Sequence, residues 1–284
     1  MLLFRHGAPG QEGPGIVDRN GKLRDLTDRV ADITSETIGA GIVAQISGLD
    51  PAELPLLPEG TRIGPCVGKV GKFVCVGLNY LDHAAEAGMP TPAEPILFMK
   101  ATTSIVGPND DVIMPRGAEK LDWEVELGIV IGSVARDIEE DAAEACIAGY
   151  CVVNDVSERS FQLERGGQWL KGKSADSFGP IGPYMVARAA VADPHNLDLW
   201  LEVDGHRYQN GNTSNMIFKV PFLVSYISRF MTLMPGDIIA TGTPAGVGMG
   251  QRPPVYLKDG AQMRLCVSGL GEQAQTVRTR GTAT

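Results

Sequence analysis

The stretch Asp122-Trp123-Glu124-Val125-Glu126-Leu127-Gly128 places two carboxylates in the middle of an apolar run. The run predicts a β-strand over 123–132, in which alternate side chains point to opposite faces. One face then carries the apolar residues Trp123, Val125, Leu127, Ile129 and Ile131. The two glutamates share the other face, with Cβ atoms roughly 7 Å apart at about 3.3 Å rise per residue. Taken alone, such a pair is more typical of the solvated face of an exposed strand.

A third carboxylate, Asp155, ends a second apolar run over 149–154. Three converging carboxylate oxygens are the ligands that a hard divalent cation such as Mg²⁺ or Mn²⁺ prefers. Glu124, Glu126 and Asp155, called the acidic triad below, are therefore candidates for a metal site.

The composition excludes several classes of protein. The chain has 284 residues, of which 43% are hydrophobic, and a formal net charge of −9. This charge, with no run of Lys and Arg, argues against sequence-independent nucleic-acid binding, and an anionic substrate would need local positive charge. The five cysteines are odd in number and form no Cys-x-x-Cys pair, which is typical of free thiols in a reducing compartment.

The apolar segments predict a cytoplasmic protein with no membrane partner. The first residues lack the long apolar core of a signal peptide. The most apolar later stretch, 216–234, contains Lys219, Pro221 and Arg229, so it predicts a packed helix instead of a membrane span.

The chain divides into a small unit over 1–70 and a larger domain over 71–284. An Asn20-Gly21 hairpin signal lies between two short strands of the first unit, and a buried-strand pattern begins at residue 72. Further strands are predicted at 96–100, 123–132, 149–154, 183–187, 198–203, 206–210, 237–241 and 262–267. Helices are predicted at 79–87, 139–147 and 220–232. Because strands do not alternate regularly with long helices, we predict a β-rich α+β fold instead of a doubly wound parallel sheet.

His83 and Glu86 follow the strand that starts at residue 72. Asn79 is a candidate helix N-cap, and the helix would place His83 and Glu86 three residues apart on one face. A carboxylate that accepts from one imidazole nitrogen fixes the tautomer and leaves the other nitrogen as a base. The same spacing also suits an ordinary surface His–Glu pair.

Two glycine-containing segments remain. The segment 167–174 matches the phosphate-binding pattern G-x-x-x-x-G-K-[ST], but it lacks a preceding strand and meets Pro180 too soon for a useful helix, so we reject a nucleotide hydrolase. Lys173 is instead a candidate point charge beside the acidic triad. The segment 241–248 could bring backbone N–H groups and the Thr243 hydroxyl close to a ligand, although a simple tight turn is the more common case for such a glycine-rich loop.

The order of these motifs along the chain resembles that of the fumarylacetoacetate hydrolase superfamily over about residues 70 to 270. The resemblance follows, in order, His83 and Glu86, then 98–100, 124–128, 154–159, 171–183, 235–237 and 241–244. Within the superfamily, 154–169 is most similar to hydrolases of 2,4-diketo-3-deoxy sugar acids and to ureidoglycolate lyases. The resemblance implies a mixed β-roll catalytic domain, a small N-terminal α/β domain and a homodimer.

The resemblance also implies the site and its chemistry. A Mg²⁺ or Mn²⁺ ion would be held by the acidic triad, and a His83–Glu86 dyad would activate water with Lys173 as a catalytic partner. The expected reaction is hydrolysis of a C–C bond in a 2,4-dioxo acid, which releases pyruvate or a similar 2-oxo acid plus a carboxylic acid. The candidates for contacting the rest of the substrate are Lys100, Arg159, Gln162 and Thr243. Isomerase, decarboxylase, hydratase or ureidoglycolate lyase chemistry on the same fold stays open, as does a non-catalytic metal-binding protein.

Overall fold

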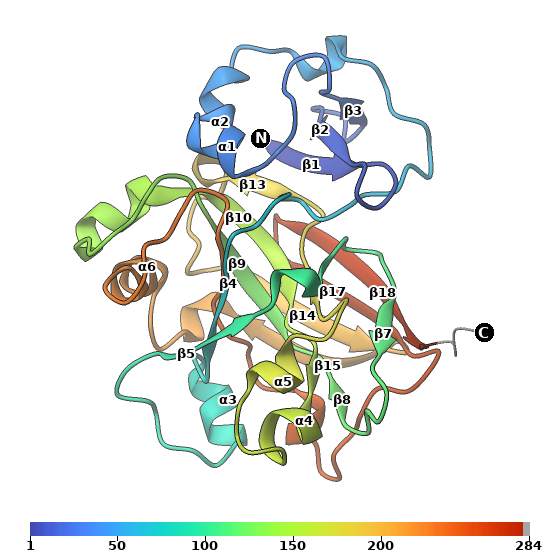
Figure 1. The fold of residues 1–284 in the computed structure, drawn as a ribbon, viewed down its shortest axis with the longest axis vertical. Helices are drawn as coiled ribbons and strands as arrows, with labels where there is room; N and C mark the ends of the chain where they lie inside the picture. The colour runs from blue at the N-terminus through green and yellow to red at the C-terminus, as the bar shows by residue number, and fades with distance from the viewer. Residues whose placement is uncertain (281–284) are drawn as a thin grey trace.

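The computed structural model describes residues 1–280, which form two large β-sheets with short helices around them (Figure 1). The nine-stranded mixed sheet has the order β3 (Leu23–Asp25), β2 (Gly13–Val17), β1 (Leu2–His6), β13 (Met185–Ala187), β10 (Ile147–Asn154), β9 (Val125–Ile131), β16 (Ile238–Ala240), β4 (Phe73–Gly77) and β5 (Ile96–Lys100). The five-stranded sheet has the order β15 (His206–Asn212), β14 (Asp198–Val203), β17 (Gln262–Val267), β18 (Gly271–Thr279) and β7 (Val112–Met114). Two short ribbons pair β11 (Ser157–Glu158) with β8 (Leu121–Asp122) and β12 (Gly179–Pro180) with β6 (Ile105–Val106). The predicted β-rich α+β fold is confirmed.

The helices are short. The α-helices are α1 (Ser35–Gly39), α2 (Ile42–Gln45), α3 (Leu81–Glu86), α4 (Arg159–Leu163), α5 (Leu170–Lys173) and α6 (Val220–Ser228). Single 3₁₀ segments are η1 (Pro51–Glu53), η2 (Thr102–Ser104), η3 (Glu140–Cys146), η4 (Arg188–Ala190), η5 (Thr213–Asn215) and η6 (Gly248–Gly250). The helix predicted at 139–147 is thus the 3₁₀ segment η3, and no helix within residues 1–280 is long and apolar enough to cross a bilayer.

Strand β9 is the centre of the fold and explains why the glutamates have fixed positions. Every residue of β9 is buried, and the strand lies between β10 and β16. The alternating residues predicted for one face, from Trp123 to Ile131, lie in one core cluster with Leu201 of β14 and Leu265 of β17. On the other face, Val130 packs in a second cluster with Ile38 and Ile42 of the N-terminal helices. Burying each such side chain contributes about 1.5–3 kcal/mol, so both faces hold β9 firmly.

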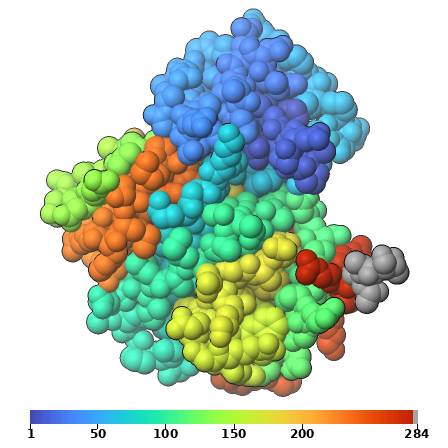
Figure 2. Space-filling model, in the orientation of Figure 1, coloured from blue at the N-terminus to red at the C-terminus, as the bar shows by residue number. Residues whose placement is uncertain are grey.

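The N-terminal strands extend the main sheet. β1 pairs antiparallel with β13 through Leu2↔Val186 and Leu3↔Met185, and β2 and β3 continue outward from β1. The N-terminal residues, coloured blue, cover one end of the molecule, whereas α3, α4 and α5 lie at the other end (Figures 1 and 2). The division of the chain at residue 70 stays a prediction.

Most strand predictions agree with the structure, but β18 was not predicted. β5, β14 and β17 have the predicted bounds. β18 is rich in polar residues, and its Gln273 and Gln275 are buried. This burial is tolerated because their side-chain amides donate to backbone carbonyls, Gln273 to Val152 O at 2.9 Å and Gln275 to Pro108 O at 2.6 Å. Hydrophobic periodicity does not detect a strand whose inward residues are hydrogen-bonded amides.

Candidate active site

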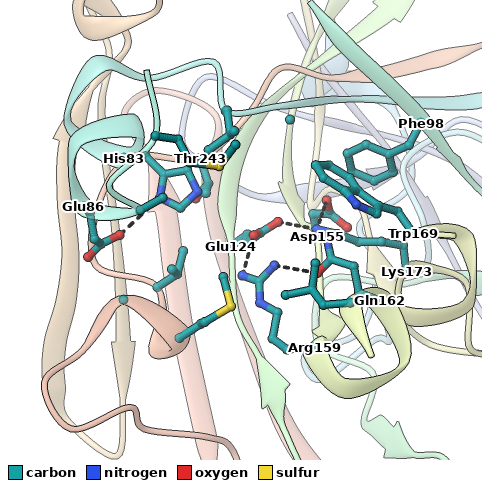
Figure 3. A pocket seen from close by; sticks show the side chains of 18 of the residues that line it. His83, Glu86, Phe98, Glu124, Asp155, Arg159, Gln162, Trp169, Lys173 and Thr243 are labelled. Carbon is teal, nitrogen blue, oxygen red and sulfur yellow. Dashed lines mark hydrogen bonds and ion pairs between the residues drawn. The ribbon is translucent and has the colours of Figure 1, made fainter. Parts of the chain in front are cut away.

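A cavity of about 360 Å³ opens at the end of the sheet where β4 and β10 stop and β9 begins. Antiparallel pairing of Asn154 with Val125 brings the end of β10 next to the start of β9. Helix α3 lies on one side of this cavity and α4 and α5 lie on the other (Figure 3). Segments that are far apart in the sequence therefore meet at one sheet edge.

The acidic triad lines the cavity and is buried. One carboxylate oxygen from each of Glu124, Glu126 and Asp155 lies within 4.8 Å of the others. Glu126 belongs to β9, and Glu124 and Asp155 lie just beyond the paired ends of β9 and β10, where Asp155 N donates to Glu124 O at 2.9 Å. Glu126 Oε2 also accepts from Gly242 N at 2.7 Å. The sheet register thus brings together the three acids that the sequence suggested as ligands.

Buried cations pair with two of the three triad carboxylates, Glu124 and Asp155. Lys173 Nζ donates to Glu124 Oε2 at 2.6 Å and to Asp155 Oδ2 at 2.7 Å, and it lies 5.0 Å from the centre of the Phe98 ring. Arg159 Nη2 donates to the other oxygen of Glu124 at 2.6 Å. Both carboxylate oxygens of Glu124 therefore carry a charge-assisted hydrogen bond, which is the stronger kind.

These contacts shift the pKa values of the cluster. Burial would raise the pKa of Glu124, but the charges of Arg159 and Lys173 outweigh it and lower the pKa to about 2. Burial raises the pKa of Glu126 well above its usual value, and the charges of Asp155 and Glu124 add to this. Burial would lower the pKa of Lys173, but Asp155 and Glu124 outweigh it and raise that pKa. Lys173 is therefore an ammonium ion and Glu124 a carboxylate at neutral pH.

His83 and Glu86 form the expected pair on α3. The His83 ring is buried, and its Nδ1 lies 3.1 Å from Glu86 Oε2, which leaves Nε2 for other contacts. Glu86 Oε1 accepts from Gly246 N at 2.9 Å, so the carboxylate is held from two sides. The N-cap prediction was wrong, because Tyr80 precedes α3. The Asn79 side chain instead donates to Phe218 O and Thr241 O and accepts from Phe218 N, which ties the start of α3 to two distant loops.

Of the four predicted substrate contacts, three line the cavity: Arg159, Gln162 and Thr243. Gln162 Oε1 accepts from Arg159 Nη1 at 3.0 Å, and Thr243 Oγ1 donates to Val125 O at 2.9 Å. Lys100 differs from its prediction, because it is 1% exposed and lies behind the cavity. Its Nζ donates to Asp155 Oδ1 and to Val156 O, so it holds a triad residue instead of facing a ligand.

The segment that matches the phosphate-binding pattern has a different structure. It leads from α4 into α5, a four-residue helix that ends at Lys173. A nucleotide-binding loop needs a strand before it and a long helix after it. Neither element is present around this segment, and Lys173 is bonded to Glu124 and Asp155 of the triad. Both observations agree with the rejection of a nucleotide hydrolase.

The sequence reasoning missed Asp122 and the apolar wall. Asp122 is fully buried, and its Oδ2 accepts from Arg159 Nε at 2.8 Å. Its position two residues before Glu124 was a signal, but nothing local shows that Arg159 bridges the two acids. The apolar wall is the set of large apolar side chains that line the cavity, and it includes Phe98 and Trp169, whose rings lie 5.3 Å apart.

The residues present fit a divalent cation. The donor set is three carboxylates, and two oxygens on one Mg²⁺ ion at about 2.1 Å lie about 3.0–4.2 Å apart, so small side-chain rotations would bring all three to one ion. The buried carboxylates of the triad and Asp122 outnumber the cations Lys100, Lys173 and Arg159 by one. The cluster therefore has room for further positive charge.

Comparison with known proteins agrees with this geometry. A family model described as fumarylacetoacetate (FAA) hydrolase C-terminal matches residues 72–278. A relative from Burkholderia multivorans (strain ATCC 17616 / 249), named “Putative hydrolase”, is 60% identical over 279 residues, which cover 98% of this chain and 99% of the relative.

Two solved structures align with this protein over 99% of this chain and over 100% of the solved chain. Fumarylacetoacetate hydrolase (EaFAH) from psychrophilic Exiguobacterium antarcticum is 35% identical, with a TM-score of 0.86. The 2-hydroxyhepta-2,4-diene-1,7-dioate isomerase from Mycobacterium marinum is 32% identical, with a TM-score of 0.74. With the family model matched over most of the chain and the whole fold shared, this protein belongs to the fumarylacetoacetate hydrolase family.

Proposed function

We propose that this enzyme is a divalent-metal-dependent hydrolase that cleaves a C–C bond in a 2,4-dioxo acid and releases pyruvate, or a similar 2-oxo acid, plus a carboxylic acid. One observation carries the proposal: a single cavity has the acidic triad on its floor and the His83–Glu86 dyad at its side. A similar protein is named fumarylacetoacetate hydrolase, which supports cleavage of a diketo acid. The homodimer implied by the family stays a prediction, which light scattering tests.

The substrate would bind through its 2-oxo acid end. Bound Mg²⁺ or Mn²⁺ would supply Lewis-acid chemistry at the 2-oxo group and offset negative charge in the product. Arg159 uses three of its five N–H donors on Asp122, Glu124 and Gln162, and the other two are available to a substrate carboxylate. A bound divalent cation would also turn the excess of one negative charge in the cluster into an excess of one positive charge, which meets the need that the net charge of −9 creates.

The dyad would activate water. Glu86 accepts the Nδ1–H of His83, so the tautomer with a free Nε2 lone pair is favoured. His83 Nε2 takes a proton from water, and the hydroxide attacks the 4-oxo carbon. The bond between carbons 3 and 4 breaks, and its electron pair forms the enolate of the 2-oxo acid. The His83 imidazolium returns the proton to carbon 3, which balances the reaction.

The group on carbon 4 would lie against the apolar wall. The residues that form this wall are Leu78, Met89, Phe98, Leu163, Trp169 and Met249. Such a wall favours an apolar acyl group over a polyhydroxylated one, because sugar hydroxyls buried against it would lack hydrogen-bond partners.

The test is pyruvate release from a panel of 2,4-dioxo acids with Mg²⁺ or Mn²⁺. We expect release to stop after chelation and His83→Ala to lower kcat by about 10²–10⁴-fold, the usual contribution of a general base. His206→Ala is the matched control, since His206 is exposed on β15. Full turnover after rigorous metal removal would refute metal dependence. Double-bond migration without cleavage would identify an isomerase, and CO₂ release without a carboxylic acid would identify a decarboxylase.

A further inference from the structure

One glycine-rich loop donates hydrogen bonds to both halves of the site. Gly242 N donates to Glu126 Oε2 at 2.7 Å, and Gly246 N donates to Glu86 Oε1 at 2.9 Å. Further along, the N–H groups of Gly248 and Met249 donate to Asp122 at 2.6 and 3.0 Å. The loop over 242–250 therefore touches the triad, the dyad and the buried carboxylate of Asp122.

Asp122 is the point at which the loop is anchored to the sheet. Its Oδ1 accepts from Trp123 N and Gly248 N, at 2.8 and 2.6 Å, and its Oδ2 accepts from Met249 N and Arg159 Nε, at 3.0 and 2.8 Å. All four partners are donors, so both oxygens of Asp122 act as acceptors. The side chain is fully buried and does not line the cavity.

Arg159 carries the position of Asp122 to the triad. Its guanidinium donates from Nε to Asp122 and from Nη2 to Glu124, at 2.8 and 2.6 Å. The guanidinium is planar, so fixing one edge of it on Asp122 fixes the direction from which Glu124 is held. Without the contact to Asp122, the guanidinium would be free to move together with Glu124 and would no longer fix the orientation of that carboxylate.

The loop carries the position of Asp122 to the dyad. Gly248 lies so close to Asp122 that an added Cβ would be 2.7 Å from Oδ1. Two residues later, a Cβ on Gly250 would be 2.3 Å from Glu86 Cδ, so the backbone of η6 packs directly on the Glu86 carboxylate. Displacing this loop would therefore displace Glu86 and, through it, the His83 ring.

We propose that Asp122 is a positioning residue that aligns the acidic triad, through Arg159, with the His83–Glu86 dyad, through the loop over 242–250. This inference rests on the proposed function, in which the acidic triad and the His83–Glu86 dyad act on one substrate. In this role Asp122 acts through its neighbours, because its own side chain does not line the cavity.

The experiment compares Asp122→Asn with the matched control Asp237→Asn. Asp237 is also fully buried and accepts from Lys72 N and Met234 N, but it lies before β16, at the end of that strand away from the site. In Asp122→Asn the amide NH₂ cannot accept, so Arg159 or the loop loses a partner. We expect Mn²⁺ affinity, measured from free Mn²⁺ by electron paramagnetic resonance, to fall about 10–100-fold, as for other residues that support metal ligands. We expect Asp237→Asn to lower Tm while Mn²⁺ affinity stays within twofold of wild type.

A second variant separates the two connections. Gly250→Ala should lower kcat at least tenfold while Mn²⁺ affinity stays within twofold, whereas Asp122→Asn should lower both. If Asp122→Asn does not fold, Arg159→Lys tests the same connection, because an ammonium lacks the planar fork by which Arg159 contacts Asp122 through Nε and Glu124 through Nη2. The proposal would be overturned if Asp122→Asn, or Arg159→Lys in its place, bound Mn²⁺ with wild-type affinity. An equal loss of Mn²⁺ affinity in Asp237→Asn would also overturn it. A wild-type protein that binds Mn²⁺ but releases no pyruvate would refute the proposed function alone, since the Mn²⁺ comparison would still decide the role of Asp122.

Discussion

Replacing Lys173 with methionine tests the electrostatic balance of the site. Lys173 is 2% exposed and its ammonium is shared by Glu124 and Asp155, at 2.6 and 2.7 Å. Methionine keeps much of the volume but leaves two buried carboxylate oxygens without that cation. Removing one partner of a buried pair costs about 3–5 kcal/mol. At about 2–4 °C per kcal/mol for a chain of this size, the metal-free variant should melt about 6–20 °C below wild type.

A divalent cation should restore part of this loss, because it supplies positive charge at the same two carboxylates. In wild type the cation shares them with the ammonium, whereas in Lys173→Met it does not. A tenfold tighter Kd would correspond to about 1.4 kcal/mol and thus to an extra Tm increase of about 3–6 °C at equal Mn²⁺ concentration. The assay is a thermal melt with chelator and with Mn²⁺. Lys171→Met is the control, since Lys171 is exposed on the same helix. An equal Tm increase in variant and wild type would refute the reasoning.

Three further changes test other parts of the structure. Glu126→Gln should raise the Tm of the metal-free protein and abolish the Tm increase with Mn²⁺. Burial and the charges of Asp155 and Glu124 raise the pKa of Glu126, so its ionised form destabilises the metal-free protein, and glutamine removes that carboxylate. A Tm increase with Mn²⁺ that persists in the variant would count against Glu126 as a ligand. Asp18→Asn should lower Tm at neutral pH, and the difference in Tm from wild type should shrink as pH falls below about 3.8. The Lys22 N–H and Arg24 lower the pKa of Asp18, so the stability that the Asp18 carboxylate adds is lost as the carboxylate protonates. A Tm difference that does not change with pH would contradict this. Gly149→Ala should destabilise by about 1–3 kcal/mol in a denaturant titration, because its Cβ would lie 2.2 Å from Val186 O on β13, whereas Gly48→Ala, which meets nothing within 4 Å, should not.

Local patterns in the sequence were sufficient for much of the fold and for the list of candidate ligands. Alternation from Trp123 to Ile131 predicted which face of β9 is apolar, and the core cluster agrees. The three-residue spacing of His83 and Glu86 predicted a contact that α3 makes at 3.1 Å. These features depend on neighbours within one strand or one helical turn, and backbone periodicity is enough to place them.

Only the tertiary structure decided what the remaining polar residues do. Lys100 bonds Asp155, 55 residues away, instead of facing the cavity, and Asn79 joins loops at 218 and 241 instead of capping α3. Asp122 meets Gly248 across 126 residues. Such partners are brought together by the register of β9, β10 and β16 and by the packing of the loops that follow them. A buried polar group bonds whatever donor or acceptor that packing brings near, because leaving it unpaired costs about 1–3 kcal/mol, and no local pattern shows which group that will be.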